Sequence, residues 1–174
     1  METLYILRHG IAVDPGTPGV ADEDRRLTPK GRKRLREIGR GLSRLGLDPD
    51  RIVTSPLPRA SETAEIIAES MGASGLVEVD DVLRSGTEPR AIRDWLRSRR
   101  ETRLVIVGHN PALSDLITLL VAGEGSTATV CELRKGGIAA LRPLSGGPDR
   151  FELDWVATPR LIRRLSAVNP PPRR

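Results

Sequence analysis

The chain contains two histidines, His9 and His109, and each follows shortly after a run of four apolar residues, at positions 4–7 and 104–107. A short continuous apolar run is typical of a strand buried on both faces of a parallel sheet. In open α/β sheets, ligands bind beyond the carboxyl ends of the strands. We therefore expect the two imidazoles to lie together at the edge of the sheet where chemistry takes place.

Two arginines are expected at the same edge. Arg8 directly extends the first apolar run, and Arg59 follows a second predicted strand near the start of a helix. A guanidinium in such a position is costly to bury unless an anion pairs with it. Guanidinium groups bind phosphate oxygens in a bidentate manner, and helix N-termini favour anions. The pattern predicts a phosphate site in which a neutral imidazole can act as nucleophile.

Other phosphate and cofactor chemistries fit the sequence poorly. A cysteine phosphatase needs an arginine six residues after its nucleophile, but Gly137 stands six residues after Cys131. The chain has neither a P-loop nor a dinucleotide-binding glycine motif. The histidines and carboxylates show no compact ligand spacing. We therefore expect no metal and no cofactor.

The composition indicates one globular domain. A chain of 174 residues is long enough for a hydrophobic core, and glycine and proline are scattered along it. We expect a single domain over residues 1–166 and a disordered Pro/Arg tail over residues 167–174. No signal peptide or membrane span is expected, because the apolar runs are short. A single cysteine is typical of a reducing compartment, so we expect a cytoplasmic protein.

The net charge of +5 would attract anionic partners. Nucleic acid is not expected, because a base-stacking platform needs more aromatic side chains than the chain offers, namely Tyr5, Trp95, Phe151 and Trp155. Arg25, Arg26 and Arg84 could instead meet an acidic protein. The sequence carries no signal for an oligomeric state.

Strand-like and helix-like segments alternate along the chain, with a long loop over residues 11–27. Strands are predicted at 3–8, 51–54, 76–79, 104–107, 128–133, 137–144 and 150–156, with a hairpin turn at 145–149. Helices are predicted at 28–45, 59–71, 88–99, 111–121 and 159–166, the first capped by Thr28 with Leu35, Ile38, Leu42 and Leu45 on its apolar face. This order predicts a three-layer α/β/α sandwich with a mostly parallel sheet and antiparallel strands added near the C-terminus.

Three motifs in this order resemble those of the histidine phosphatase, or phosphoglycerate mutase-like, superfamily. They are Leu7-Arg8-His9-Gly10, the stretch from Thr54 to Ala64 (Thr-Ser-Pro-Leu-Pro-Arg-Ala-Ser-Glu-Thr-Ala) and Val107-Gly108-His109-Asn110-Pro111. The short chain and the stretch Arg26-Leu27-Thr28-Pro29-Lys30-Gly31 look most similar to SixA-type phosphohistidine phosphatases. The resemblance implies a phosphoglycerate mutase-like fold and metal-independent hydrolysis. It implies that His9 forms a phosphohistidine intermediate, while Arg8, Arg59 and His109 bind the phosphoryl oxygens.

The proton donor departs from the pattern of many relatives, which place a glutamate shortly after the third strand. Ser85 stands there in this chain, which leaves Glu88, Asp14 and Asp22 as candidate acids. A phosphate ester needs a positioned acid more than the labile P–N bond of phosphohistidine does. We therefore expect a phosphohistidine substrate in a signalling or phosphotransfer protein, of the histidine-phosphotransfer type. Two alternatives are a phosphatase of small phosphorylated molecules and a non-catalytic phosphate-binding module.

Overall fold

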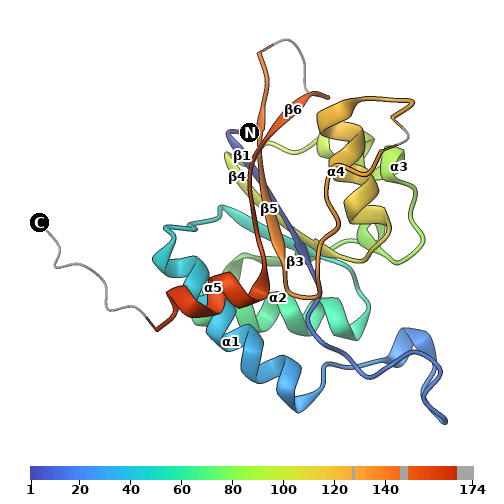
Figure 1. Cartoon of the computed structure of the whole chain (residues 1–174), viewed down its shortest axis with the longest axis vertical. Coiled ribbons are helices and arrows are strands. Elements are labelled where there is room, and N and C mark those ends of the chain that lie inside the picture. The colour runs from blue at the N-terminus through green and yellow to red at the C-terminus, as the bar shows by residue number, and fades with distance from the viewer. Residues whose placement is uncertain (127, 146–148, 168–174) are drawn as a thin grey trace, which may run out of the picture.

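Strands and helices alternate up to residue 122, and an antiparallel hairpin and a last helix follow (Figure 1). The computed structural model describes residues 1–126, 128–145 and 149–167. In these residues the strands are β1 (Thr3–Arg8), β2 (Arg51–Thr54), β3 (Val77–Val79), β4 (Arg103–Gly108), β5 (Ile138–Pro143) and β6 (Phe151–Ala157). The α-helices are α1 (Pro29–Arg44), α2 (Pro58–Met71), α3 (Pro89–Leu96), α4 (Ala112–Ala122) and α5 (Pro159–Leu165).

The described strands form one sheet in the order β3-β2-β4-β1-β5-β6. The strands from β3 to β1 are parallel, whereas β5 is antiparallel to β1 and to β6. β1 therefore lies in the middle of the sheet, between β4 and β5. This confirms the predicted α/β sandwich, with its mostly parallel sheet and late antiparallel strands.

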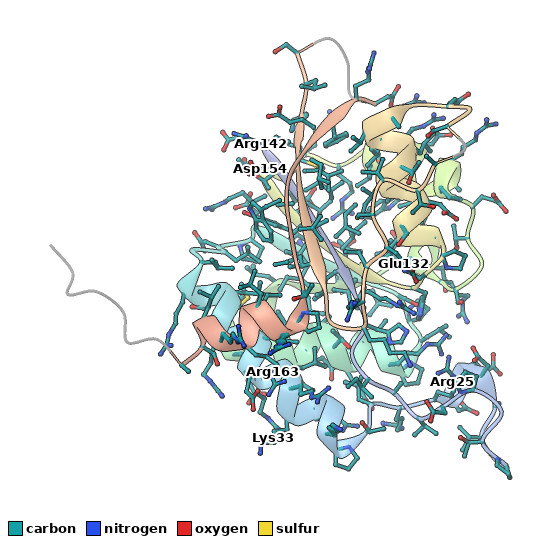
Figure 2. All side chains as sticks on the ribbon, viewed as in Figure 1. Arg25, Lys33, Glu132, Arg142, Asp154 and Arg163 are labelled. Atoms are coloured by element: carbon teal, nitrogen blue, oxygen red, sulfur yellow. The ribbon has the colours of Figure 1, made fainter. Side chains whose placement is uncertain are left out.

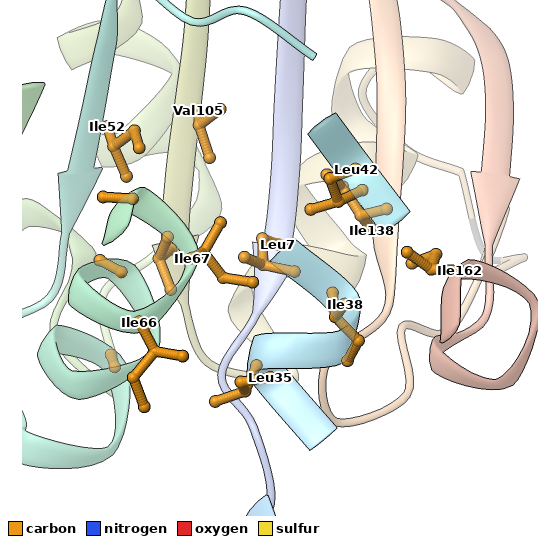
Figure 3. Close-up of a cluster of buried hydrophobic side chains, with 14 of the residues drawn as sticks. Leu7, Leu35, Ile38, Leu42, Ile52, Ile66, Ile67, Val105, Ile138 and Ile162 are labelled. Atoms are coloured by element: carbon orange, nitrogen blue, oxygen red, sulfur yellow. The ribbon is translucent and has the colours of Figure 1, made fainter. Parts of the chain in front are cut away.

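Alternate residues of the central strands face opposite layers, as the pleat of a strand requires. Leu7 of β1 and Val107 of β4 pack with α1, α2 and α5 in one core (Figure 3). Ile6 and Ile106 pack with α3 and α4 in a second core on the other face. Because both faces are covered, residues 4–7 of β1 and 104–107 of β4 are all apolar, which is why these stretches form continuous apolar runs.

Helix α1 begins where its sequence predicts. The hydroxyl of Thr28 accepts a hydrogen bond from the Gly31 amide at 3.0 Å, which caps the helix. At Gly31 the helix lies against the chain that follows His9, since an added Cβ would lie 2.1 Å from the Ile11 carbonyl oxygen. Leu35, Ile38 and Leu42 are buried, but Leu45 is 46% exposed. The expectation that Leu45 belongs to the apolar face of this helix is therefore wrong. Leu45 lies at the C-cap, where the helix ends.

Two other expectations are wrong in part. The predicted strand at 128–133 does not form, because its described backbone turns to α4, where Val130 and Leu133 donate hydrogen bonds to the hydroxyls of Thr118 and Ser114. The helix predicted over residues 88–99 ends at Leu96. After it, the Arg99 guanidinium pairs with Glu78 and Glu101.

The centre of the predicted hairpin turn at 145–149 and residues 168–174 of the predicted tail lie outside the described residues. Among the helices that are described, none is both long and apolar enough to cross a membrane.

Candidate active site

His9 lies at the carboxyl end of β1 and is 5% exposed. Its amide donates a hydrogen bond to the Gly108 carbonyl at 3.0 Å, which holds it beside the end of β4. Its Nδ1 lies 2.8 Å from the carbonyl oxygen of Gly10. Because a carbonyl only accepts, this contact places the imidazole proton on Nδ1. The lone pair is then on Nε2, the atom that a nucleophilic histidine needs free.

His109 follows β4 and brings the second imidazole to the same edge. The ring centres of His9 and His109 are 5.2 Å apart. The Nε2 atom of His109 lies 2.9 Å from the hydroxyl oxygen of Ser55, which also accepts a hydrogen bond from the Leu57 amide at 3.3 Å. Because the Ser55 oxygen already accepts a hydrogen bond, its hydroxyl proton is best placed to donate to His109 Nε2. Ser55 therefore favours the tautomer of His109 that carries its proton on Nδ1.

The surroundings of both imidazoles favour the neutral form. Burial lowers the pKa of His9 from 6.5 to about 3, helped by the positive charges of Arg59, Arg8 and Lys135 and opposed by its hydrogen bond to Gly10. Burial likewise lowers the pKa of His109 to about 3, with His9 and Arg59 adding to the effect. Both rings are therefore neutral near pH 7, which keeps the lone pair of His9 available.

Arg59 lies in the first turn of α2 and is 2% exposed. Its Nη1 donates to the backbone oxygen of Asp22 at 2.7 Å, and its Nη2 lies 3.2 Å from the Asp22 carboxylate. Burial lowers the pKa of Arg59 from its usual value. The long loop over residues 11–27 therefore supplies a carboxylate that meets a buried guanidinium at the edge of the site.

Asp22 is the one candidate acid that the structure brings to these residues. Partial burial would raise the pKa of its carboxyl, but hydrogen bonding to Arg25 and the charge of Arg59 outweigh it and lower the pKa. Asp22 is thus ionised at neutral pH. Asp14 is exposed, and Glu88 lines a cavity of about 430 Å³ beside α3 and α4. Ser85, at the usual acid position, shares a cavity of about 410 Å³ with Asp22.

Arg8 is half-buried and is held by the segment that precedes β5. Its Nη1 donates to the Leu133 carbonyl at 2.7 Å, and the side chain of Asn110 donates to the same oxygen at 3.1 Å. Burial lowers the pKa of Arg8, although the negative charge of Glu132 opposes this. The Leu133 carbonyl, which lies far along the chain, therefore orients the Arg8 guanidinium. A backbone contact of this kind cannot be inferred from side-chain types.

Thr63 and Glu62 of α2 tie the parts of the site together. The Thr63 hydroxyl accepts from the Gly10 amide at 3.0 Å and donates to the Arg59 carbonyl at 2.6 Å. The buried Glu62 carboxylate accepts from the Leu27 amide at 3.0 Å, and Arg26 and Arg32 pair with it. Both residues belong to the motif from Thr54 to Ala64, but their types and spacing alone indicated no role for either in the site.

The arginines expected to meet an acidic partner already have carboxylate partners. Arg25 and Arg26 contact Asp22 and Glu62, and Arg84 contacts Asp81 (Figure 2 labels Arg25). Within the described chain, no group of three or more His, Cys, Asp or Glu side chains is placed to hold a metal ion.

Known proteins resemble this chain in sequence, and others resemble it in fold. The model of the histidine phosphatase superfamily (branch 1) matches residues 4–85. An uncharacterised protein from Picosynechococcus sp. is 38% identical over 146 residues, which are 80% of this chain and 84% of that protein. The mitochondrial serine/threonine-protein phosphatase Pgam5 from Drosophila yakuba is 38% identical over 68 residues, 39% of this chain but 22% of Pgam5.

A solved structure of the protein histidine phosphatase SixA, complexed with tungstate, has the same fold. Its TM-score is 0.76 at 21% sequence identity, and the match covers 91% of this chain and 97% of that one. The fold, the matched motif region and the long cyanobacterial match agree with one another, and we conclude that the chain belongs to the histidine phosphatase superfamily.

Proposed function

We propose that this protein is a cytoplasmic, metal-independent phosphatase that removes the phosphoryl group from phosphohistidine in a signalling or phosphotransfer protein. The observation that carries the proposal is the state of His9. Its Nδ1 is bound to the Gly10 carbonyl, and its pKa is lowered to about 3, so Nε2 carries a free lone pair at neutral pH. This is the state required for attack on phosphorus.

The reaction has two displacements. In the first, the Nε2 lone pair of His9 forms a bond to phosphorus and the substrate P–N bond breaks. Its electron pair stays on the departing imidazole, which leaves as a neutral ring because its other nitrogen carries a proton. In the second, water attacks the phosphorus on His9, the new P–N bond breaks with its electron pair returning to Nε2, and both water protons leave with the product as dihydrogen phosphate. His9 returns to the neutral form.

Arg8, Arg59 and His109 surround His9 and would stabilise the charge on the phosphoryl oxygens during both displacements. The arginines are charged and partly or fully buried, so their attraction for an anion is less screened than on an open surface. Burial also makes each guanidinium costly without a counter-charge. The solved SixA structure with the same fold is complexed with tungstate, an analogue of phosphate, which supports anion binding by a protein of this fold.

The preference for a P–N bond rests on the lack of a protonated acid. Asp22 is the carboxylate that lies at the site, and hydrogen bonding to Arg25 together with the charge of Arg59 keeps its pKa low. An ionised carboxylate cannot give a proton to an alkoxide leaving group. An imidazole leaving group needs less help, so the site suits phosphohistidine better than an alkyl phosphate.

A second candidate is a phosphatase of small phosphate esters. The cavity of about 410 Å³ lined by Asp22, Arg84 and Ser85 favours it, because a small leaving group could enter there. Asp22 would then have to take up a proton when the substrate displaces it from Arg59. The two candidate functions therefore differ in how strongly the turnover rate depends on the leaving group of the substrate.

A substrate panel tests the proposal. Wild-type protein and His9→Ala are compared on a phosphorylated histidine-phosphotransfer domain, free phosphohistidine and alkyl phosphate esters. We expect turnover of phosphohistidine in the domain, acid-labile phosphate on the wild-type enzyme after rapid quenching, and no turnover by His9→Ala. Faster turnover of the esters would favour the second candidate. A wild-type chain that neither turns over any activated phosphate nor becomes phosphorylated would be a binding module.

A further inference from the structure

A groove whose charged lining residues are all cations begins directly beside the His9 loop. It has a volume of about 390 Å³ and lies between the first turns of α1, the segment before β5 and the start of α5. Gly10 and Ile11, which follow His9 in the chain, form part of its wall. The cationic side chains come from segments far apart in the sequence: Arg34, Arg134, Lys135, Arg160 and Arg163. Figure 2 shows Arg163 on α5, close to α1.

Most of these cations lack a carboxylate partner. Arg163 pairs with Glu37 of α1, whereas the other four have no carboxylate within salt-bridge distance among the described residues. Elsewhere the arginines are largely paired, as Arg93 is with Glu124 and Arg103 with Asp50. Gathering like charges costs free energy through their mutual repulsion. The folded protein therefore gathers four cations without a carboxylate partner, among the described residues, around a single groove.

The groove and the candidate active site around His9, called the phosphoryl centre below, share a wall. The Gly136 amide donates to the backbone oxygens of both Arg8 and His9, at 3.0 Å each. Lys135, the preceding residue, is close enough that its charge lowers the pKa of His9. A protein that presents a phosphorylated side chain to His9 has to approach this edge of the sheet, and the groove begins at the same edge.

We propose that the groove docks the acidic surface around the phosphohistidine of the protein substrate, with Arg34, Arg134, Lys135 and Arg160 as the contacting cations. This inference rests on the proposed function and adds the surface that selects the substrate protein. Carboxylates flanking the phosphohistidine would supply the counter-charge that these cations lack within the chain. Long-range attraction between the two surfaces would also accelerate encounter.

The test reverses two charges that lie away from the phosphoryl centre. The variant is Arg34→Glu/Arg160→Glu, and its control is Arg40→Glu/Arg100→Glu, which makes the same charge change at exposed positions outside the groove. The substrates are an acidic histidine-phosphotransfer domain phosphorylated with phosphoramidate, the same domain with its flanking carboxylates changed to amides, and free phosphohistidine. Thermal unfolding shows whether each variant is folded, and Arg34→Gln/Arg160→Gln replaces the reversal if it is not.

We expect the groove variant to raise KM for the acidic domain about tenfold at low salt, with kcat unchanged and little effect at high salt. KM for free phosphohistidine and for the amide domain should stay within about twofold of the wild-type value, and the control variant should behave as wild type. An unchanged KM for the acidic domain overturns the inference but leaves the proposed function standing. Equal losses on all substrates also overturn it, because the groove would then act on the centre itself. A wild-type enzyme inactive on the phosphorylated domain overturns both.

Discussion

The Thr63 hydroxyl accepts a hydrogen bond from the Gly10 amide at 3.0 Å and so fastens the loop after His9 to helix α2. The same hydroxyl donates to the Arg59 carbonyl one turn earlier in that helix. The proposed nucleophile and the buried guanidinium are therefore positioned through one fully buried side chain.

Replacing Thr63 by valine should destabilise the protein and disturb the site together. The Gly10 amide would be left buried without an acceptor, which costs about 1–3 kcal/mol. Urea unfolding measures this loss, and steady-state kinetics should show a lower kcat. Thr63→Ser keeps the hydroxyl and should recover most of the activity. A valine variant with wild-type stability and kcat would show that this bond does not position His9.

Ser55→Ala should lower kcat by about fivefold, which corresponds to the loss of one hydrogen bond of about 1 kcal/mol that fixes His109. The alanine removes the hydroxyl that lies 2.9 Å from His109 Nε2. Nitrogen-15 chemical shifts of the imidazole ring report the tautomer directly and should change in the variant. The matched control is Ser61→Ala, because the Ser61 hydroxyl donates to the Pro58 carbonyl within α2. Unchanged ring shifts would contradict a tautomer role for Ser55.

The two neutral histidines predict how stability depends on pH. Their pKa values are about 3 in the folded protein and near 6.5 in the unfolded chain. Between these values the unfolded state binds more protons, so the free energy of unfolding falls as pH falls below 6.5 and gains nothing from the histidines above pH 7. The slope is about 1.4 kcal/mol per pH unit for each histidine.

Urea unfolding at pH 7, 6 and 5 checks this expectation, with His9→Gln/His109→Gln as the comparison. Carboxylates titrate in both proteins, so the difference between the two slopes isolates the histidines. Equal slopes would mean that the imidazoles protonate normally. In the wild-type enzyme, kcat/KM for free phosphohistidine should also show no loss near pH 6.5 attributable to His9.

Asp22→Asn distinguishes two roles for the Asp22 carboxylate, which could be a proton donor or an anion that competes with phosphate for Arg59. The Asp22 carboxylate lies 3.2 Å from Arg59 Nη2, the guanidinium that would bind phosphate. Without its negative charge, tungstate and inorganic phosphate should inhibit severalfold more strongly, while kcat for phosphohistidine should change by less than about twofold. A general acid would behave differently, since its loss lowers kcat by about 10²–10⁴-fold. A fall of that size on phosphohistidine would assign the proton donor to Asp22.

The sequence was most informative where residue type and strand position coincide. Apolar runs locate β1 and β4, and parallel pairing then brings His9 and His109 to one edge, where the structure has their rings 5.2 Å apart. Contacts made through backbone atoms could not be predicted in this way, as with Arg8 and the Leu133 carbonyl. The segment 128–133 has strand-forming residues, but its backbone is held by α4 rather than by a neighbouring strand.

Asp22 shows a different limit of sequence patterns. It lies in a long loop without periodicity, 37 residues from Arg59, and nothing in the chain distinguishes it from Asp14 as a partner for that guanidinium. Its place at the site depends on how the loop is held, through the Leu27 amide on Glu62 and through Arg25 on the Val13 carbonyl. These contacts are local consequences of the packed fold, and a reading of residue types cannot supply them.

The position of β4 between β1 and β2 also governs when the site can form during protein synthesis. His9 and Arg59 both lie within the first 59 residues of the chain, but β1, which precedes His9, does not pair with β2, which precedes Arg59. A growing chain that stops before residue 103 offers β1 neither β4 nor β5 as a neighbour. The ribosome therefore has to complete β4 and release it before His9 and Arg59 can share a sheet edge, however early His9 is translated.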